Sequence, residues 1–181
     1  MKLKVGDKMP NFTYNTAFET GKEFKDALEG KTVLWVLRYI GCPSCRYDCH
    51  LITQRHDEFK AKGAKVIMLM QSDAEHIKAD MERTNETFPF EIICDTDQAI
   101  YKEFEINPAA SMEELVGDDK EKAGALFAAV KEAGFVHGDY EGDEQQLPAL
   151  FIIDEEGTIT YAKYAKSLVD MPSIDEVLAL L

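Results

Sequence analysis

The fold is decided by one stretch near the start of the chain, Thr32-Val-Leu-Trp-Val-Leu-Arg-Tyr-Ile-Gly-Cys-Pro-Ser-Cys-Arg46. Residues 32–38 form a mostly apolar run rich in β-formers, which is typical of a strand buried on both faces. The loop Ile40-Gly41 follows the run. A helix is expected to begin at Pro43, because the first helical position needs no N–H donor. The stretch therefore predicts a buried strand that turns directly into a helix.

This helix is expected to run from about Pro43 to Lys62 and to end at Gly63. Apolar residues recur along it at three- and four-residue steps, with one gap at His56, and form a core face of Cys45, Cys49, Ile52 and Phe59. A second buried strand is expected at Lys65–Met70. Strand, helix and strand in this order predict a right-handed parallel βαβ unit.

The rest of the chain continues as an α/β protein. The expected elements are a short strand at 12–16, a helical turn at 23–28, a helix that begins with Ser72 and Glu75 as a capping box, a strand at 90–94, a helix at 99–104, a hairpin of 149–153 and 158–162, and a closing helix at 172–181. We therefore expect a single domain spanning residues 1–181, with a central mixed sheet flanked by helices and an extended N-terminus.

A polar segment of about residues 107–146 interrupts this rhythm. Residues 112–133 contain helical patterns, whereas residues 137–144 form a loop rich in acids. Asp139, Glu141 and Asp143 alternate as calcium ligands do, but the glycine and glutamate that an EF-hand loop requires are absent. We interpret this segment as an inserted helical excursion with a solvated acidic loop.

Composition excludes several classes of function. The chain has 181 residues and a formal net charge of −14, so binding to nucleic acids or to anionic membrane surfaces is disfavoured. No apolar run is long enough to span a bilayer, and the N-terminus lacks the apolar core of a secretory signal. We expect a cytoplasmic protein, in which three cysteines clustered within residues 42–49 indicate redox catalysis or metal binding.

The pair Cys42 and Cys45 is placed where a helix N-terminus can activate a thiol. Unpaired N–H groups and the helix dipole stabilise a thiolate there, and only a thiolate attacks a disulfide or a peroxide. Cys42 precedes the apolar face and is expected to be exposed, so it is the expected attacker. Cys45 lies on the face and is expected to be partly buried and to resolve the mixed disulfide. Arg38 and Arg46 are expected to add positive charge, and Tyr39 is expected to line the cleft.

Metal binding and packing are the alternatives to redox catalysis for these cysteines. A zinc site would need four ligands, and Cys42, Cys45, Cys49 and His50 lie along one helix and cannot all converge, so no metal or cofactor is expected. Cys49 shares the apolar face and fits a core role, although it is near enough to Cys45 to serve as a rescue thiol. Cys94 fits packing in a buried strand.

Four stretches resemble one known family. They are Val5–Phe12, Leu37–Arg46, Phe88–Asp97 with Tyr101–Phe104, and Phe151–Ile159. Together they resemble the thioredoxin-fold superfamily and, within it, the peroxiredoxin-like branch (alkyl hydroperoxide reductase/thiol-specific antioxidant, redoxin). The resemblance covers most of the chain apart from residues 107–146. It implies a thioredoxin-like central sheet and dithiol chemistry.

The details of the resemblance leave two substrates open. Peroxiredoxins carry a Pro-x-x-x-Thr/Ser-x-x-Cys site, but those proline and hydroxyl positions hold Arg38 and Cys42 in one register and Trp35 and Tyr39 in the other. Leu147-Pro148 resembles the cis-proline of thioredoxins, which would lie beside the two cysteines and favour disulfide exchange.

The sequence therefore predicts a thiol oxidoreductase that cycles Cys42 and Cys45 through an internal disulfide and reduces peroxides. The alternative within the same class is a reductase of protein or small-molecule disulfides. An alternative of another class is a redox sensor or metal-binding module without turnover. Cys49, Pro43 and Pro148 are candidate supporting residues. A thioredoxin- or glutaredoxin-type protein is the expected reductant, and homodimer formation stays open.

Overall fold

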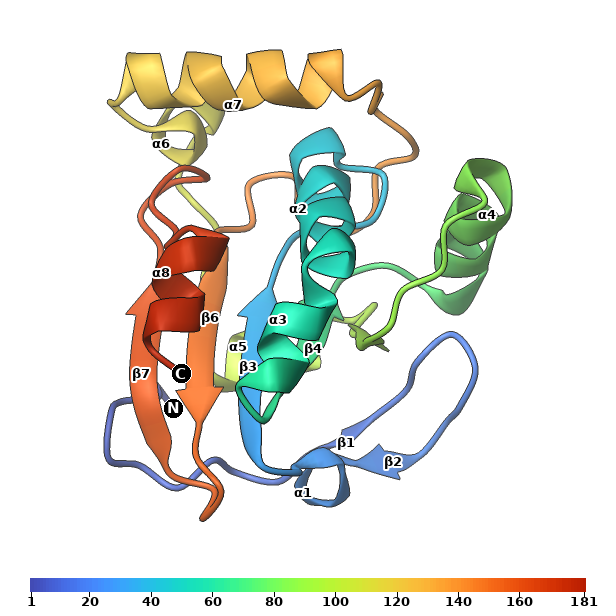
Figure 1. Cartoon of the computed structure of the whole chain (residues 1–181). Helices are drawn as coiled ribbons and strands as arrows, with labels where there is room; N and C mark the ends of the chain where they lie inside the picture. Colours follow the sequence, from blue (N-terminus) through green and yellow to red (C-terminus); the bar gives the residue numbers. More distant parts are fainter.

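A five-stranded mixed sheet organises the computed structural model, which describes all residues 1–181 (Figure 1). Its strands, in spatial order, are β5 (Glu91–Cys94), β4 (Ala64–Met70), β3 (Lys31–Val36), β6 (Ala149–Ile153) and β7 (Ile159–Tyr164). β3 pairs parallel with β4, and β4 pairs parallel with β5, whereas β6 runs antiparallel to both β3 and β7. The expected α/β fold with a mixed central sheet is confirmed.

Helices and short elements complete the chain. They are α1 (Phe24–Ala27), α2 (Pro43–Gln54), α3 (His56–Ala61), α4 (Ala74–Thr84), α5 (Ala99–Glu103), α6 (Met112–Val116), α7 (Lys120–Glu132) and α8 (Ile174–Ala179), with a separate antiparallel pair of β1 (Thr13–Tyr14) and β2 (Lys22–Glu23). No helix of the structure combines the length and the apolar character that crossing a bilayer requires.

The sheet is buried on both faces, as its apolar strands predict. Alternate residues point to opposite faces, so Val33 and Trp35 of β3 pack under α2, α3 and α8, while Leu34 and Val36 face the other side. There the N-terminal segment, α1 and α5 cover the sheet. The core face of α2 therefore rests on the sheet, with Cys45, Cys49 and Ile52 in it.

Two local predictions need correction. The expected single helix Pro43–Lys62 is broken at Arg55, where α2 ends and α3 begins. The Thr53 hydroxyl donates to the Cys49 carbonyl at 2.7 Å, and such back-bonding bends helices. The residue that caps α4 is Asp73 rather than Ser72, because the Asp73 carboxylate accepts the His76 N–H at 2.8 Å.

Residues 107–146 form an excursion whose ends meet. Pro108 and Gln146 form an isolated antiparallel bridge, and the Ala109 N–H donates to the Gln145 carbonyl at 2.8 Å. The excursion contains α6 and α7, which confirms the expected helical pieces. Figure 1 shows α7 lying across the end of the sheet where α2 begins, so the inserted segment covers the region of the clustered cysteines.

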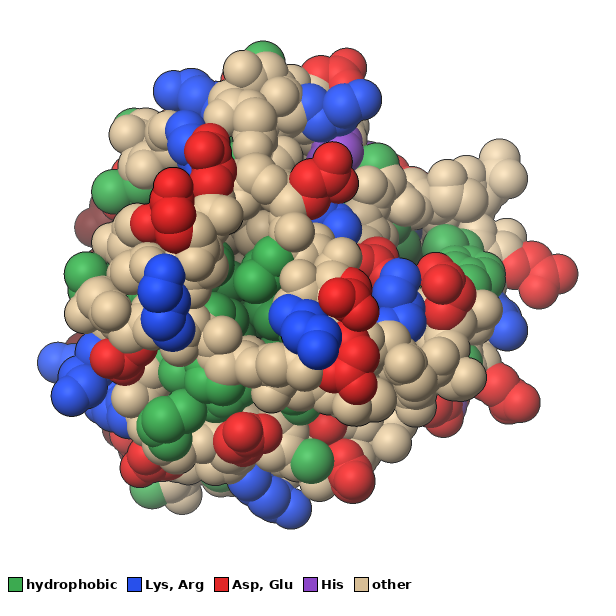
Figure 2. All heavy atoms as spheres, turned by 90° about the horizontal axis from the view of Figure 1, so that it is seen from below, with side chains coloured by type: hydrophobic (Ala, Val, Ile, Leu, Met, Phe, Trp, Pro, Cys, Tyr) green, Lys and Arg blue, Asp and Glu red, His purple; other side chains and the backbone are tan.

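The opposite end of the molecule carries no single-sign patch. Figure 2 shows this end with acidic and basic side chains interspersed around a smaller apolar area. The acidic residues on this face are therefore scattered among basic ones rather than gathered into one site.

Candidate active site

Cys42 occupies the N-cap position of α2, immediately after the loop that leaves β3. Its sulfur accepts the backbone N–H of Cys45 at 3.4 Å, and Pro43 fills the first helical position. The same sulfur lies 3.2 Å from the Ser44 Oγ. The strand–turn–helix arrangement read from the sequence thus aims the donors of the helix start at the Cys42 sulfur.

Both sulfurs are covered, so the expected exposure of Cys42 is wrong. Cys42 is 0 % exposed and Cys45 is 3 % exposed. Residues 137–144, here called the strap, lie against the loop that precedes Cys42, although the sequence predicts them to be a solvated loop. Its Gly138 N–H donates to the Gly41 carbonyl at 2.8 Å, and a side chain at position 41 would collide with the Asp139 carbonyl. Glycine at position 41 therefore permits the strap to approach the cysteines this closely.

Side chains hold the strap at both of its ends. The Tyr39 hydroxyl lies 3.1 Å from His137 Nε2, and Arg38 donates to the Glu144 carbonyl. Next to Glu144, the Asp143 N–H donates to Gln71 Oε1 at 2.9 Å, and Gln71 Nε2 donates to the Asp143 carbonyl at 3.2 Å. Tyr39 is fully buried and contacts His137 of the strap. The prediction that Tyr39 lines an open cleft is therefore wrong, because its hydroxyl anchors the strap instead.

The electrostatics separate the two cysteines. Burial by itself would raise the pKa of Cys42, but hydrogen bonding with Cys45, the charge of Arg38 and the Ser44 hydroxyl lower it to about 5. Burial, with the neighbouring Cys42 sulfur, raises the pKa of Cys45 well above its ordinary value. Near neutral pH the pair therefore consists of a Cys42 thiolate and a Cys45 thiol.

The two arginines singled out from the sequence have different positions. The Arg38 guanidinium donates to the Cys42 sulfur at 2.9 Å, so its charge acts directly on the thiolate. Arg46 turns away toward α4, where its Nε meets Asp80 at 2.8 Å and its Nη2 meets Glu86 at 2.8 Å. The expected contribution of Arg46 at the cysteines is therefore wrong, because nearby carboxylates on another helix claim its charge.

Pro148 reaches the site, but in a different conformation from the one expected. No peptide bond in the chain is cis, so the predicted cis Leu147-Pro148 bond is wrong. The Pro148 carbonyl accepts the Ala165 N–H at 3.1 Å, which extends the pairing of β6 with β7 by one step. Its ring lines a small cavity that also contains Cys45.

Cys49, Cys94 and His50 lie apart from the contacts of the Cys42 sulfur. Cys49 is fully buried, and burial raises the pKa of its thiol. Burial also raises the pKa of Cys94 to about 11. His50 Nδ1 lies 2.8 Å from the Glu86 carboxylate, and its ring packs 5.4 Å from that of Phe135.

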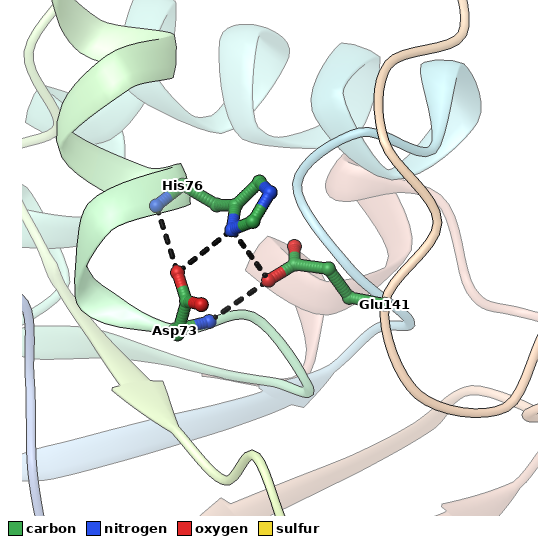
Figure 3. A group of neighbouring side chains, drawn as sticks. All are labelled: Asp73, His76 and Glu141. Carbon is green, nitrogen blue, oxygen red and sulfur yellow. Dashed lines mark hydrogen bonds and ion pairs between the residues drawn. The ribbon is translucent and has the colours of Figure 1, made fainter.

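One cluster of ligand-type side chains anchors the middle of the strap. Asp73, His76 and Glu141 bring their polar atoms within 4.8 Å of one another, with His76 Nδ1 at 2.8 Å from Asp73 and 3.2 Å from Glu141 (Figure 3). On the far side of the ring, His76 Nε2 meets Asp139 at 3.0 Å. The hydrogen bond to Asp73 raises the pKa of His76, which favours the imidazolium. The His76 imidazolium thus places a positive charge among the carboxylates of Asp73, Asp139 and Glu141.

Sequence reasoning missed three contributors to this site. Ser44 touches the Cys42 sulfur, and His76 clasps the strap from a different helix. Asp48 is partly buried one helical turn after Cys45 and lines the same cavity. Only Asp48 had a usable signal, because residues three apart on a helix lie on one side.

The arrangement as a whole is a nucleophilic site: a buried thiolate, a thiol within the same helical turn, and a guanidinium on the thiolate. A family model described as the AhpC/TSA family matches residues 5–162. No curated protein matched the sequence.

Solved structures repeat the fold over nearly the whole chain. A cysteine-to-serine mutant of peroxiredoxin 6 from Arenicola marina has a TM-score of 0.72 at 16 % identity, with 98 % of this chain and 71 % of that chain covered. A yeast mitochondrial 1-Cys peroxiredoxin has a TM-score of 0.65 at 20 % identity, with 98 % of this chain and 74 % of that chain covered. A peroxiredoxin-like protein from Aquifex aeolicus has a TM-score of 0.65 at 18 % identity, with 99 % of this chain and 86 % of that chain covered.

Proposed function

The chain belongs to the AhpC/TSA family of peroxiredoxin-like thiol peroxidases, and on this premise we propose that it reduces peroxides with Cys42 and Cys45. The Cys42 thiolate attacks one peroxide oxygen, so that an S–O bond forms and the O–O bond breaks. The leaving oxygen takes up a proton and departs as an alcohol or as water. Cys42 is thereby oxidised to a sulfenic acid.

Cys45 completes the cycle in this proposal. Its sulfur attacks the Cys42 sulfur, an S–S bond forms, the S–O bond breaks, and the hydroxide leaves as water with the proton that Cys45 loses. A dithiol protein of the thioredoxin or glutaredoxin type then reduces the disulfide and is itself oxidised. Residues three apart in the first helical turn lie close enough for such a bond.

One observation carries the proposal: the Arg38 guanidinium lies 2.9 Å from the Cys42 sulfur. A cation at this distance, with the N–H donors of the helix start, keeps Cys42 ionised at neutral pH. In the register that makes Cys42 the attacking cysteine, Trp35 and Tyr39 replace the proline and the hydroxyl residue of peroxiredoxins, so activation here relies on charge. The Ser44 hydroxyl, 3.2 Å from the sulfur, supplies a donor that the sequence pattern did not indicate.

The strap requires a step before the chemistry. Because Cys42 is fully covered, a peroxide reaches its sulfur only after residues 137–144 move away from Gly41. Their anchors are polar side chains and single backbone contacts, which break more easily than a packed core. Access is therefore proposed to depend on opening of the strap.

Disulfide reduction would use the same two cysteines, but its specific support is weaker. The cis-proline that favoured it is absent, and Pro148 pairs through its carbonyl with the Ala165 N–H of the neighbouring strand end. A redox sensor without turnover is the remaining alternative. Sustained peroxide consumption with an added dithiol reductant would separate this alternative from an enzyme.

The proposal is tested by mixing the reduced protein with hydrogen peroxide in a stopped-flow instrument and mapping quenched samples by peptide mass. Wild type should oxidise far faster than a free thiol and form the Cys42–Cys45 disulfide. Cys42→Ser should abolish the fast reaction, Cys45→Ser should stop at the sulfenic acid, and Cys94→Ser should behave as wild type. Oxidation of wild type at free-thiol speed would overturn the peroxidase assignment.

A further inference from the structure

Asp48 is a carboxylate without a partner beside the second cysteine. It lies on α2 three residues after Cys45 and four after Ser44, so all three side chains share one side of the helix. They line a small cavity of about 20 Å³ together with Pro148 and with Leu126 of α7. A cavity of this size has room for about one water molecule between polar groups.

The surroundings offer Asp48 no compensating charge. Burial and the nearby Cys42 thiolate raise the pKa of its carboxyl to about 7, and no hydrogen bond or cation offsets them. The elements packed against it contribute only Leu126, Leu168, Met171, Pro148 and Leu37 to the cavity. The one cation in the lining is Arg38, which is engaged with the Cys42 sulfur and the Glu144 carbonyl.

Asp48 is partly buried, and its carboxylate takes no hydrogen-bond partner from the protein. Structural stabilisation does not explain it, because an apolar residue would fill the same space without a desolvation cost. A role in the reaction does explain it. Cys45 must lose a proton before its sulfur can attack, and its pKa is raised, so thiolate is scarce without a base.

We propose that Asp48 accepts the proton of the Cys45 thiol, through one bridging water in the shared cavity, when the disulfide closes. This inference rests on the proposed function, of which it specifies the second step. It makes Asp48 the general base of resolution, while Arg38 serves the first step at Cys42.

Resolution conserves atoms and charge. The Asp48 carboxylate takes the Cys45 proton, the resulting sulfur anion attacks the oxidised Cys42 sulfur, and the S–O bond breaks with loss of hydroxide. Asp48 then releases the proton, and proton and hydroxide leave as water. The Cys45 and Cys42 sulfurs share the new S–S bond, and the carboxylate is regenerated.

The test measures the two steps separately. Sulfenic acid formation is followed with a trapping dione in the Cys45→Ser background, and disulfide closure is followed by rapid quench and mass mapping with both cysteines present. Asp48→Asn should slow closure by roughly 100-fold, the lower end of general-base effects, and should leave sulfenic acid formation within about threefold of its rate. Asp48→Glu should restore much of the closure rate, and Asp57→Asn, an exposed acid on α3, should change neither step.

The pH profile supplies the readout that a structural role would not produce. Wild-type closure should rise with pH through the Asp48 pKa, which burial raises above its ordinary value, and this limb should disappear in Asp48→Asn. A closure rate and profile unchanged in Asp48→Asn would overturn the role of Asp48 alone. Absence of Cys42 sulfenic acid in the Cys45→Ser background would overturn the peroxidase function and this inference with it. Thermal unfolding of Asp48→Asn should occur at or above the wild-type temperature, since the substitution removes a charge that burial disfavours.

Discussion

Two regions meet at the Cys42 sulfur, and different forces hold them. The junction of β3 and α2 has the ordinary supports of the core: β3 pairs on both edges, and the Arg46 N–H donates to the Cys42 carbonyl at 2.9 Å. The strap of residues 137–144 belongs to no helix or strand and is held mainly by side chains of the elements below it. The nucleophile is thus fixed by the stable part of the fold and covered by a part that can open at low cost.

This contrast predicts that the junction is costly to damage and the strap is not. The largest effect is expected for Asp80→Ala, which removes the carboxylate from the buried pair with Arg46 that ties α2 to α4. Breaking a buried pair leaves an uncompensated charge and costs about 3 kcal/mol here, since Arg46 keeps Glu86. Chemical denaturation measures it, and Asp57→Ala on the exposed face of α3 serves as the matched control. Equal stability of the two variants would contradict the proposed importance of this tie.

A second substitution tests the junction's electrostatics rather than its stability. Arg38→Met removes the cation from the Cys42 sulfur, so the pKa of Cys42 should rise from about 5 toward its ordinary value. The rate of alkylation by iodoacetamide in mildly acidic solution should then fall by roughly tenfold or more, because each unit of pKa shift is a tenfold change in thiolate. The midpoint of the acid limb should move upward, with Lys62→Met on the surface as the control. An unmoved midpoint would exclude Arg38 as the activating charge.

Gly41→Ala probes the contact between the two regions. The added methyl group would meet the Asp139 carbonyl, so the strap must shift. We expect a loss of about 1–2 kcal/mol, as for other overpacked sites, and several-fold faster alkylation of Cys42 as its cover loosens. Gly124→Ala in α7 is the matched control, because a methyl group there meets open space and should slightly stabilise the helix. Slower alkylation in Gly41→Ala would contradict the covering role of the strap.

The junction could be predicted from the sequence because its signals are local. The apolar run of β3, Pro43 at the first helical position and the spacing of Cys42 and Cys45 lie within a few residues of each other. The same locality explains the confirmed sheet. Helix boundaries were harder to predict than the helices themselves. The break at Arg55 was missed because no glycine or proline marks it in the sequence.

The strap could not be predicted, because its contacts join residues far apart in the chain. His76 and Asp139 are 63 positions apart, and Arg38 and Glu144 are 106 apart. The sequence of an acidic loop does not show which of its carboxylates are solvated and which pair with a histidine elsewhere in the chain. The expected exposure of Cys42 was therefore wrong for a physical reason: local patterns place a cysteine at a helix start but do not show what covers it.

The smallest effect, and the most specific, concerns the clasp itself. The pKa of His76 is raised in the folded protein, chiefly by its hydrogen bond with Asp73, with help from Asp139 and Glu141. The imidazolium therefore strengthens the strap at mildly acidic pH, and this contribution is lost as pH rises through the folded pKa. Because Cys42 is already ionised there, wild-type alkylation should otherwise be flat with pH, so a second rise by a few-fold would report opening of the strap. His76→Gln should remove that rise and react faster at the acidic end, whereas His56→Gln on α3 should keep the wild-type profile. A second rise that survives in His76→Gln would assign the opening to another group.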